Sequence, residues 1–230
     1  TTGDLTWKYD KQTKTLTISG QGEMPNYKDR TVPWENFREE MEYLVIEEGA
    51  TYVGYDAFRN CHNLKSISLP ESVIEIDNMA FRECVNLTSV TIPAGVKDIS
   101  PGVFGACLKL TSIMVDEGNT NFTSVDGVLF NKGKTVLVQF PGGKSGKYII
   151  PSSVNTIYNQ AFVGCENLES VSIPADIRKV YWDAFYGCKN LIDVTIKATK
   201  LPWMDVNIFT EVPFDRAVLH VPAGMKSTYA

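Results

Sequence analysis

The sequence lacks several features that would indicate a particular class of partner. No apolar run approaches the roughly 20 residues that a membrane-spanning helix needs. The net charge is -5, and the Lys and Arg residues are scattered along the chain instead of clustered. A nucleic-acid partner is therefore not expected, because phosphate binding needs a basic patch. Membrane insertion is not expected either.

The sequence also lacks the common signatures of catalysis. It has no G-x-S-x-G, no H-E-x-x-H and no phosphate-binding loop, and its two histidines, His62 and His220, are isolated. The stretch 142–147 is rich in glycine but lacks the spacing and the strand-to-helix context of a phosphate loop. We therefore expect no catalytic residues, no metal site and no cofactor, and we predict that the protein is not an enzyme.

What the sequence does contain is a repeat. Its skeleton is an apolar residue, three residues, Ala-Phe, two residues, Cys, two residues, Leu, two residues, Ile, one residue and Leu-Pro, as in residues 53–70. A fixed period of this kind predicts the architecture more strongly than any local pattern. The Ala-Phe and Cys positions recur as Ala57-Phe58 and Cys61, Ala80-Phe81 and Cys84, Val103-Phe104 and Cys107, Ala161-Phe162 and Cys165, and Ala184-Phe185 and Cys188.

The cysteines give the period directly. They stand at 61, 84, 107, 165 and 188, so three gaps are 23 residues and one is 58. The long gap equals one ordinary coil plus one of 35 residues, which lacks the Ala-Phe and Cys segment. In this long coil, Asn131-Lys132-Gly133-Lys134 separates two apolar, β-branched runs, which predicts a β-hairpin. We count six coils between about residues 46 and 197, one of them decorated in this way.

Each coil is expected to hold two short strands and a turn. Alternation in 65–69 predicts a strand with its apolar side chains inward, and Pro70 ends it. Residues 73–76 predict a second strand, and the Ala-Phe segment a turn or a single helical turn. Stacked coils of parallel strands give a mostly β, right-handed solenoid, since parallel crossovers take that hand.

The remaining segments are expected to close the two ends of the solenoid. We predict an N-terminal cap over residues 1–43, with two antiparallel strands within 3–24 and a short helix from Trp34 to Met41. The solenoid itself would span 44–197. A C-terminal capping segment would span 198–230 and end in a strand at 218–222.

The cysteines are interpreted as buried, reduced core residues at one inward position of each coil. A pair such as Cys61 and Cys84 lies within disulfide distance if coils are about 4.8 Å apart. Stacked side chains point in parallel, however, and five is an odd number. Identical ligands at one per coil do not make a tetrahedral metal shell.

Two surfaces are candidates for binding. Four aromatic residues occupy positions where the period needs no apolar residue: Tyr158, Tyr181, Trp182 and Tyr186. They mark either a ligand-binding patch or a contact with the C-terminal segment. The second surface is the outward side of the strands, which is either a docking face or an ordinary solvated sheet. Its residues are Ser66, Ser68, Ser89, Thr91, Ser170, Ser172, Asp193 and Thr195.

These repeats resemble the BspA-like leucine-rich repeats of bacterial surface antigens. The A-F-x-x-C-x-x-L-x-x-I-x-L-P pattern matches in four of five copies, and Val103-Phe104 and Val115-Asp116 are the departures in the third. Leu16–Gly22, Val125–Phe130 and Leu219–Gly224 also match the family outside the repeat. The resemblance implies a secreted or surface-attached protein of a host-associated bacterium, whose signal segment has been removed, with adhesion and binding of host protein or glycan as its role.

We therefore predict an extracellular or cell-surface interaction module, similar to an adhesin, that binds a protein of a host or neighbouring cell. One alternative is a carbohydrate-recognition module that uses the aromatic residues between 158 and 186. The other is a structural spacer within a larger surface protein.

Overall fold

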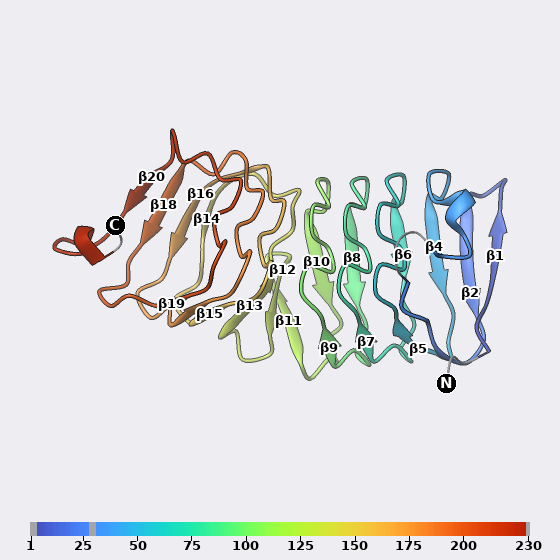
Figure 1. Ribbon diagram of the computed structural model, residues 1–230. Coiled ribbons are helices and arrows are strands. Elements are labelled where there is room, and N and C mark those ends of the chain that lie inside the picture. Colours follow the sequence, from blue (N-terminus) through green and yellow to red (C-terminus); the bar gives the residue numbers. More distant parts are fainter. Residues whose placement is uncertain (1–3, 28–30, 229–230) are drawn as a thin grey trace.

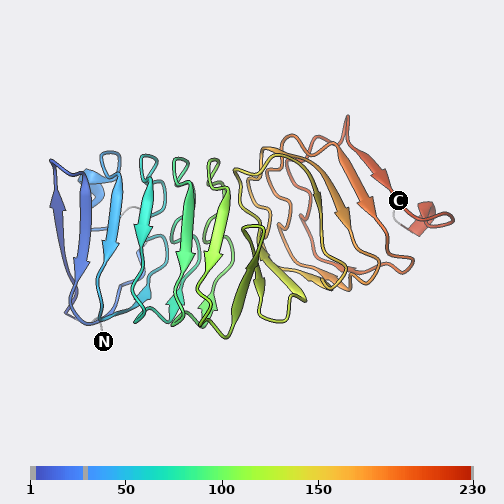
Figure 2. The same ribbon diagram turned by 180° about the vertical axis from the view of Figure 1, so that it is seen from behind.

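The protein is an elongated stack of coils with one end of the chain at each end of the stack (Figure 1). The computed structural model describes residues 4–27 and 31–228. Short strands run along two sides of the stack, and turns join them at the edges (Figure 2). The predicted leucine-rich-repeat solenoid of 23-residue coils is confirmed.

The first series of strands contains the segments that precede Pro in the repeat. It begins with an antiparallel pair, β1 and β2, and all its other pairings are parallel. Its N-terminal members are β1 (Thr6–Asp10), β2 (Thr15–Ser19), β4 (Tyr43–Ile46), β6 (Ser66–Ser68), β8 (Ser89–Ile92) and β10 (Ser112–Val115). Its C-terminal members are β14 (Gly146–Ile149), β16 (Leu168–Ile173), β18 (Asp193–Ile196) and β20 (Val218–His220).

The second series lies on the other side of the coils. Its N-terminal sheet holds β3 (Gly22–Glu23), β5 (Ala50–Val53), β7 (Glu75–Ile76) and β9 (Asp98–Ile99). Its C-terminal sheet holds β11 (Phe122–Val125), β12 (Val128–Asn131), β13 (Val136–Gln139), β15 (Thr156–Ile157), β17 (Lys179–Val180) and β19 (Trp203–Met204). Both series are interrupted at the long coil, and the first also lacks a pairing between β6 and β8. We call the parts before and after the long coil the N-terminal and the C-terminal half.

The prediction of a helix from Trp34 to Met41 was wrong in its length. Only a 3₁₀ turn, η1 (Glu35–Phe37), forms, and the Trp34 side chain makes no cap hydrogen bond to it. Trp34 is instead buried and stacks on Phe58, with the ring centroids 5.2 Å apart. The need to bury this indole against the first coil leaves little chain for a regular helix. A second 3₁₀ turn, η2 (Lys226–Thr228), lies near the C-terminus.

The Ala-Phe segments form turns that are stacked from coil to coil. In each turn two residues adopt the left-handed conformation, for example Asp56 (φ 56°) and Asn60 (φ 60°), or Met79 (φ 59°) and Glu83 (φ 63°). Turns of successive coils are joined by backbone hydrogen bonds, such as Phe58 N–H to Ala80 O at 2.8 Å. Since left-handed backbone is costly for most residues, these bonds between coils help to hold the turns in place.

The core of each half is a stack of aromatic rings. Trp34, Phe58, Phe81 and Phe104 stack with centroid separations of 5.2, 5.4 and 5.6 Å. Phe140, Phe162, Phe185 and Phe209 form a second stack with separations of 5.0, 4.6 and 5.2 Å. Rings at such distances add attraction beyond the apolar area that they bury. The two stacks belong to separate buried clusters, which meet at the long coil.

Three of these rings lie outside the sequence repeat. Phe140 takes the phenylalanine position of the long coil, because its N–H donates to Ala161 O at 2.7 Å as Phe58 does to Ala80. Trp34 and Phe209 extend the stacks into the two end segments. Strand pairing also crosses the predicted domain boundaries. β2 pairs with β4 across the boundary at 43/44, and β18 pairs with β20 across the boundary at 197/198. The three predicted domain ranges remain predictions.

The hairpin expected in the long coil is confirmed as β12 and β13. Asn131 shapes its turn, since the side-chain oxygen accepts the N–H groups of Thr135 and Val136, both at 2.9 Å. A second hairpin joins β11 to β12 through Asp126 (φ 50°) and Gly127 (φ 76°), which is the geometry of a type I′ turn. Strand β13 then pairs with β15 in parallel, so both hairpins belong to the solenoid sheet.

All five cysteines are free and buried, as expected. Four of the thiols, those of Cys84, Cys107, Cys165 and Cys188, also donate hydrogen bonds to the phenylalanine carbonyl of the preceding coil, for example from Cys84 to Phe58 O at 3.2 Å and from Cys188 to Phe162 O at 3.1 Å. Burial raises the pKa of Cys61 and of Cys188 to about 12. These thiols therefore remain protonated at neutral pH.

Candidate functional site

The two halves of the solenoid come closest at the turns beside the long coil. Ala106 N–H donates to Val163 O at 3.1 Å, a hydrogen bond between coils that are separated in sequence by the long coil. Small residues permit this approach. A Cβ on Gly105 would lie 2.6 Å from Val163 Cγ1, and a Cβ on Gly164 would lie 2.7 Å from Ala106 Cβ. The halves are inclined to each other at this joint (Figure 2).

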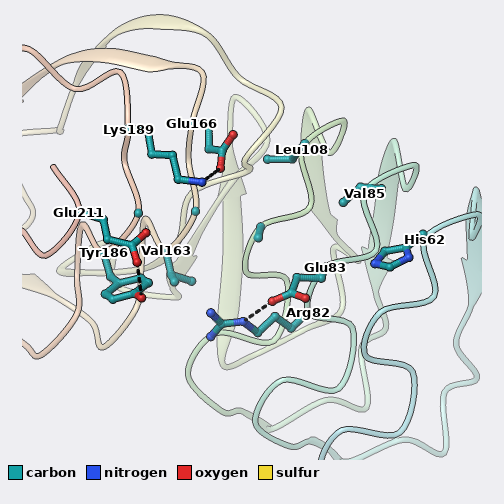
Figure 3. A pocket seen from close by; sticks show the side chains of 13 residues that line it. His62, Arg82, Glu83, Val85, Leu108, Val163, Glu166, Tyr186, Lys189 and Glu211 are labelled. Atoms are coloured by element: carbon teal, nitrogen blue, oxygen red, sulfur yellow. Dashed lines mark hydrogen bonds and ion pairs between the residues drawn. The ribbon is translucent and has the colours of Figure 1, made fainter. Parts of the chain in front are cut away.

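A crevice of about 300 Å³ opens between the two halves at this joint (Figure 3). We call it the bend crevice. Its apolar lining comes from Val85 and Leu108 of the N-terminal half and from Val163 of the C-terminal half. Charged and hydroxyl-bearing side chains also line it: Arg82, Glu83, Glu166, Tyr186, Lys189 and Glu211. Each half supplies side chains that the other lacks, so the site exists only in the assembled solenoid.

The polar side chains of the bend crevice are paired within their own half. Arg82 Nε lies 3.3 Å from Glu83 Oε1, and Lys189 Nζ lies 2.7 Å from Glu166 Oε1. The Tyr186 hydroxyl donates to Glu211 Oε1 at 2.7 Å, which raises the pKa of Tyr186. Across the opening, the Arg82 guanidinium extends toward Tyr186 (Figure 3). The crevice thus combines charges of both signs with apolar side chains.

The structure does not bring the four predicted aromatic residues together. Tyr186 lines the bend crevice, whereas Tyr158 and Tyr181 line a separate shallow groove. Their rings meet edge to face, with centroids 6.4 Å apart. Trp182 is 37% exposed and lines neither site. The proposed binding role of these residues stays a prediction.

Three residues near the aromatic pair were missed from sequence. Trp203 packs edge to face on Tyr181 with the centroids 5.4 Å apart, and Arg178 and Lys179 line the same groove. We call the groove lined by Val136, Asn155, Thr156, Tyr158, Arg178, Lys179 and Tyr181 the tyrosine groove. The period could have placed Arg178 and Lys179 here, because they stand one coil after Asn155 and Thr156. Trp203 was hidden because its segment departs from the repeat.

The outward strand residues differ between the two halves. Ser66, Ser68, Ser89 and Thr91 are exposed on β6 and β8, whereas Ser170, Ser172, Asp193 and Thr195 are half-buried on β16 and β18. The latter four are paired in register, with Ser170 opposite Asp193 and Ser172 opposite Thr195. Their part in binding also stays a prediction.

Within residues 4–27 and 31–228, no group of three or more His, Cys, Asp or Glu side chains is placed to hold a metal ion. Over the same residues, no helix has the length and apolar character that crossing a membrane requires.

Several solved structures share the fold. A leucine-rich repeat protein from Eubacterium ventriosum is 21% identical, with a TM-score of 0.52 over 86% of this chain and 72% of that one. A leucine-rich cell surface protein from Faecalibacterium prausnitzii is 24% identical, with a TM-score of 0.54 over 83% of this chain and 62% of that one. At these identities the likeness shows the fold alone.

The pneumococcal vaccine antigen PcpA is 28% identical, with a TM-score of 0.63 over 69% of this chain. The matched region spans only 42% of that antigen. No curated protein matches the sequence. The family model for the BspA type leucine rich repeat region matches six copies, over residues 35–149 and 140–214. The chain therefore belongs to the BspA-type leucine-rich repeat family.

Proposed function

We propose that this chain is a protein-interaction module of a secreted or cell-surface bacterial protein, with an adhesin-like role, and that the bend crevice contacts its protein partner. The observation that carries the proposal is the composition of that crevice. A crevice lined by apolar side chains and by charges of both signs suits a peptide segment that packs an apolar side chain into it and pairs its own polar groups with those charges. Membership of the BspA-type leucine-rich repeat family supports the location.

The test is binding of the protein to an array of extracellular-matrix proteins at physiological salt, with two charge-reversal variants. Lys189→Glu places a third carboxylate beside Glu166 and Glu211 at the crevice rim. Lys8→Glu makes the same charge change on the exposed surface of β1, at the far end of the stack. We expect at least a tenfold loss of affinity for Lys189→Glu and little change for Lys8→Glu. Equal binding by wild type and Lys189→Glu would exclude the crevice.

A second function, carbohydrate recognition, is favoured by the tyrosine groove. Two tyrosines one coil apart offer ring faces and hydroxyl groups, which suit the C–H surfaces and hydroxyls of a saccharide. Glycans on the same array test this candidate with a Tyr181→Ala variant. A protein that binds neither proteins nor glycans would instead act as a spacer.

A further inference from the structure

The tyrosine groove combines its aromatic residues with unneutralised positive charge. Arg178 and Lys179 are both exposed, and neither forms an ion pair with any residue in the ranges 4–27 and 31–228. In the bend crevice, by contrast, Arg82 and Lys189 are each paired with a carboxylate, Glu83 and Glu166. A groove with two available cations attracts an anionic ligand.

Backbone hydrogen bonds between neighbouring coils hold the segments that carry the two cations and the two tyrosine rings. Arg178, Lys179 and Tyr181 lie in one coil, and Tyr158 lies in the coil before it. The N–H groups of Arg178 and Lys179 donate to Asn155 O, at 2.8 and 3.2 Å. The residues that follow the strands are held in the same way, by Tyr158 N–H to Leu137 O at 3.0 Å and Tyr181 N–H to Ile157 O at 3.1 Å. The proposed ligand-binding residues therefore lie in or directly beside strands β15 and β17, on backbone that is held by hydrogen bonds between coils.

The uncharged groups of the groove also lack partners. Within the described residues, the hydroxyls of Tyr158 and Tyr181 make no hydrogen bond, and the Asn155 side chain uses only its oxygen, which accepts the Thr156 hydroxyl at 2.8 Å. Burial, with the nearby Asp98 carboxylate, raises the pKa of Tyr158, so this phenol stays a donor. Several hydrogen-bond donors thus remain for a ligand rich in oxygen atoms.

The same register in the N-terminal half carries the opposite charge. Tyr52, Glu75 and Asp98 follow one another across β5, β7 and β9, where Thr156, Lys179 and Trp203 follow one another across β15, β17 and β19. Burial, and then repulsion by Asp98 and other nearby carboxylates, raises the pKa of Glu75. An anionic chain would therefore be repelled by the N-terminal half and accepted by the C-terminal half.

We propose that the tyrosine groove binds an anionic saccharide, with the tyrosine rings against sugar rings and Arg178 and Lys179 on sulfate or carboxylate groups. The proposal deepens the carbohydrate function and rests on it. A saccharide fits better than an acidic peptide because the groove offers polar groups and ring faces, with Val136 as its one aliphatic side chain. Arg178 is suited to the anion because its guanidinium forms paired hydrogen bonds to planar oxyanions.

Dextran sulfate and unsulfated dextran are the probes, since they share one sugar backbone. Binding is measured at physiological salt to wild type, Arg178→Gln, Tyr181→Phe and the control Lys147→Gln, which removes an exposed charge from β14 outside the groove. We expect dextran sulfate to bind, Arg178→Gln to weaken it about tenfold, and Lys147→Gln to leave it within about twofold. Tyr181→Phe keeps the ring and should lose less than Arg178→Gln.

The outcomes separate this inference from the function on which it rests. Equal binding of dextran and dextran sulfate would overturn the anionic ligand but leave carbohydrate recognition standing. Binding of neither probe would overturn both. Polyglutamate is the third probe, and if it binds as tightly as dextran sulfate with the same loss in Arg178→Gln, the ligand is an acidic chain and not a saccharide. An equal loss in Lys147→Gln would show that attraction is spread over the surface, and the groove would be excluded.

Discussion

The two halves of the solenoid have nearly the same interior and different exteriors. Each half holds one stack of aromatic rings at separations between 4.6 and 5.6 Å, and each repeats the same pair of left-handed residues in its turns. Outside, one strand register is acidic at Glu75 and Asp98 and becomes basic and aromatic at Lys179 and Trp203. The repeat therefore constrains the side chains that point inward, and the two halves differ in the side chains that point outward.

The long coil separates the halves and also joins them. Its two hairpins widen one side of the stack, while its segment after Phe140 contains Gly142 and Gly143, which pack closely on the backbone of residues 107–110. The turns of the flanking coils then meet directly through Ala106 and Val163. The bend crevice opens beside this contact.

The largest effect on the free energy of unfolding is expected when a ring is removed from either stack. Phe81 in the N-terminal half and Phe162 in the C-terminal half are both fully buried between two other rings. Phe81→Ala and Phe162→Ala should each lower the free energy of unfolding by about 3–5 kcal/mol, because each leaves a cavity. Urea unfolding of both variants checks this, and a loss below about 1 kcal/mol in either one would contradict the equivalence of the two interiors.

A smaller effect tests the close contact of the halves. Gly164 (φ 65°) and Gly187 (φ 71°) occupy the same turn position in neighbouring coils. A Cβ on Gly187 would be 3.6 Å from its nearest neighbour, whereas one on Gly164 would be 2.7 Å from Ala106 Cβ. Gly187→Ala should cost about 1 kcal/mol from its backbone conformation alone. Gly164→Ala should cost about 1–3 kcal/mol more, since it overpacks the joint.

The same unfolding measurement on a double variant identifies the cause. Ala106→Gly removes the methyl group that a new Cβ at Gly164 would meet. If the clash is the reason, Ala106→Gly combined with Gly164→Ala should recover part of the additional loss, because Ala106 Cα and N would still lie 2.9 and 3.1 Å from the new Cβ. Equal costs for Gly164→Ala and Gly187→Ala would show that the halves are not in tight contact at this point.

The smallest effect concerns the thiol hydrogen bonds. Cys84 donates to Phe58 O at 3.2 Å, whereas the equally buried Cys61 thiol has no acceptor in residues 4–27 and 31–228. Cys84→Ala should therefore lower the free energy of unfolding by about 1 kcal/mol more than Cys61→Ala. The Phe58 carbonyl still accepts the Cys61 N–H at 3.4 Å, so the difference stays modest. Identical losses in the two variants would mean that the cysteines contribute by packing alone.

The repeat made the architecture predictable from the sequence. The coil length, the Ala-Phe turns, the buried cysteines and the hairpin at Asn131–Lys134 all follow from residues whose role is local or periodic. Trp34, Phe140 and Phe209 could not be placed in the ring stacks, because each lacks the flanking residues of the repeat. Each of these rings fills the space left at the end of a ring stack, and only the neighbouring coil defines that space.

The candidate sites were only partly predictable, for a related reason. Tyr186 and Arg82 line one crevice although about 100 residues separate them. They come together because the turns on the two sides of the long coil meet directly, through Ala106 and Val163. The sequence groups the four aromatic residues because they stand at positions where the period needs no apolar residue. On the structure, consecutive positions face different sides of the coil, so Tyr181 joins the groove and Trp182 does not.

The most direct test of this account is one array of matrix proteins and of neutral and sulfated glycans, applied to four proteins in parallel: wild type, Lys189→Glu, Arg178→Gln and Glu75→Gln. The account predicts that Lys189→Glu loses a protein partner, that Arg178→Gln loses sulfated glycans, and that Glu75→Gln, in the acidic register of the N-terminal half, loses neither. Retention of every wild-type contact by both Lys189→Glu and Arg178→Gln, or their loss in Glu75→Gln, would contradict the assignment of binding to the bend and the C-terminal half.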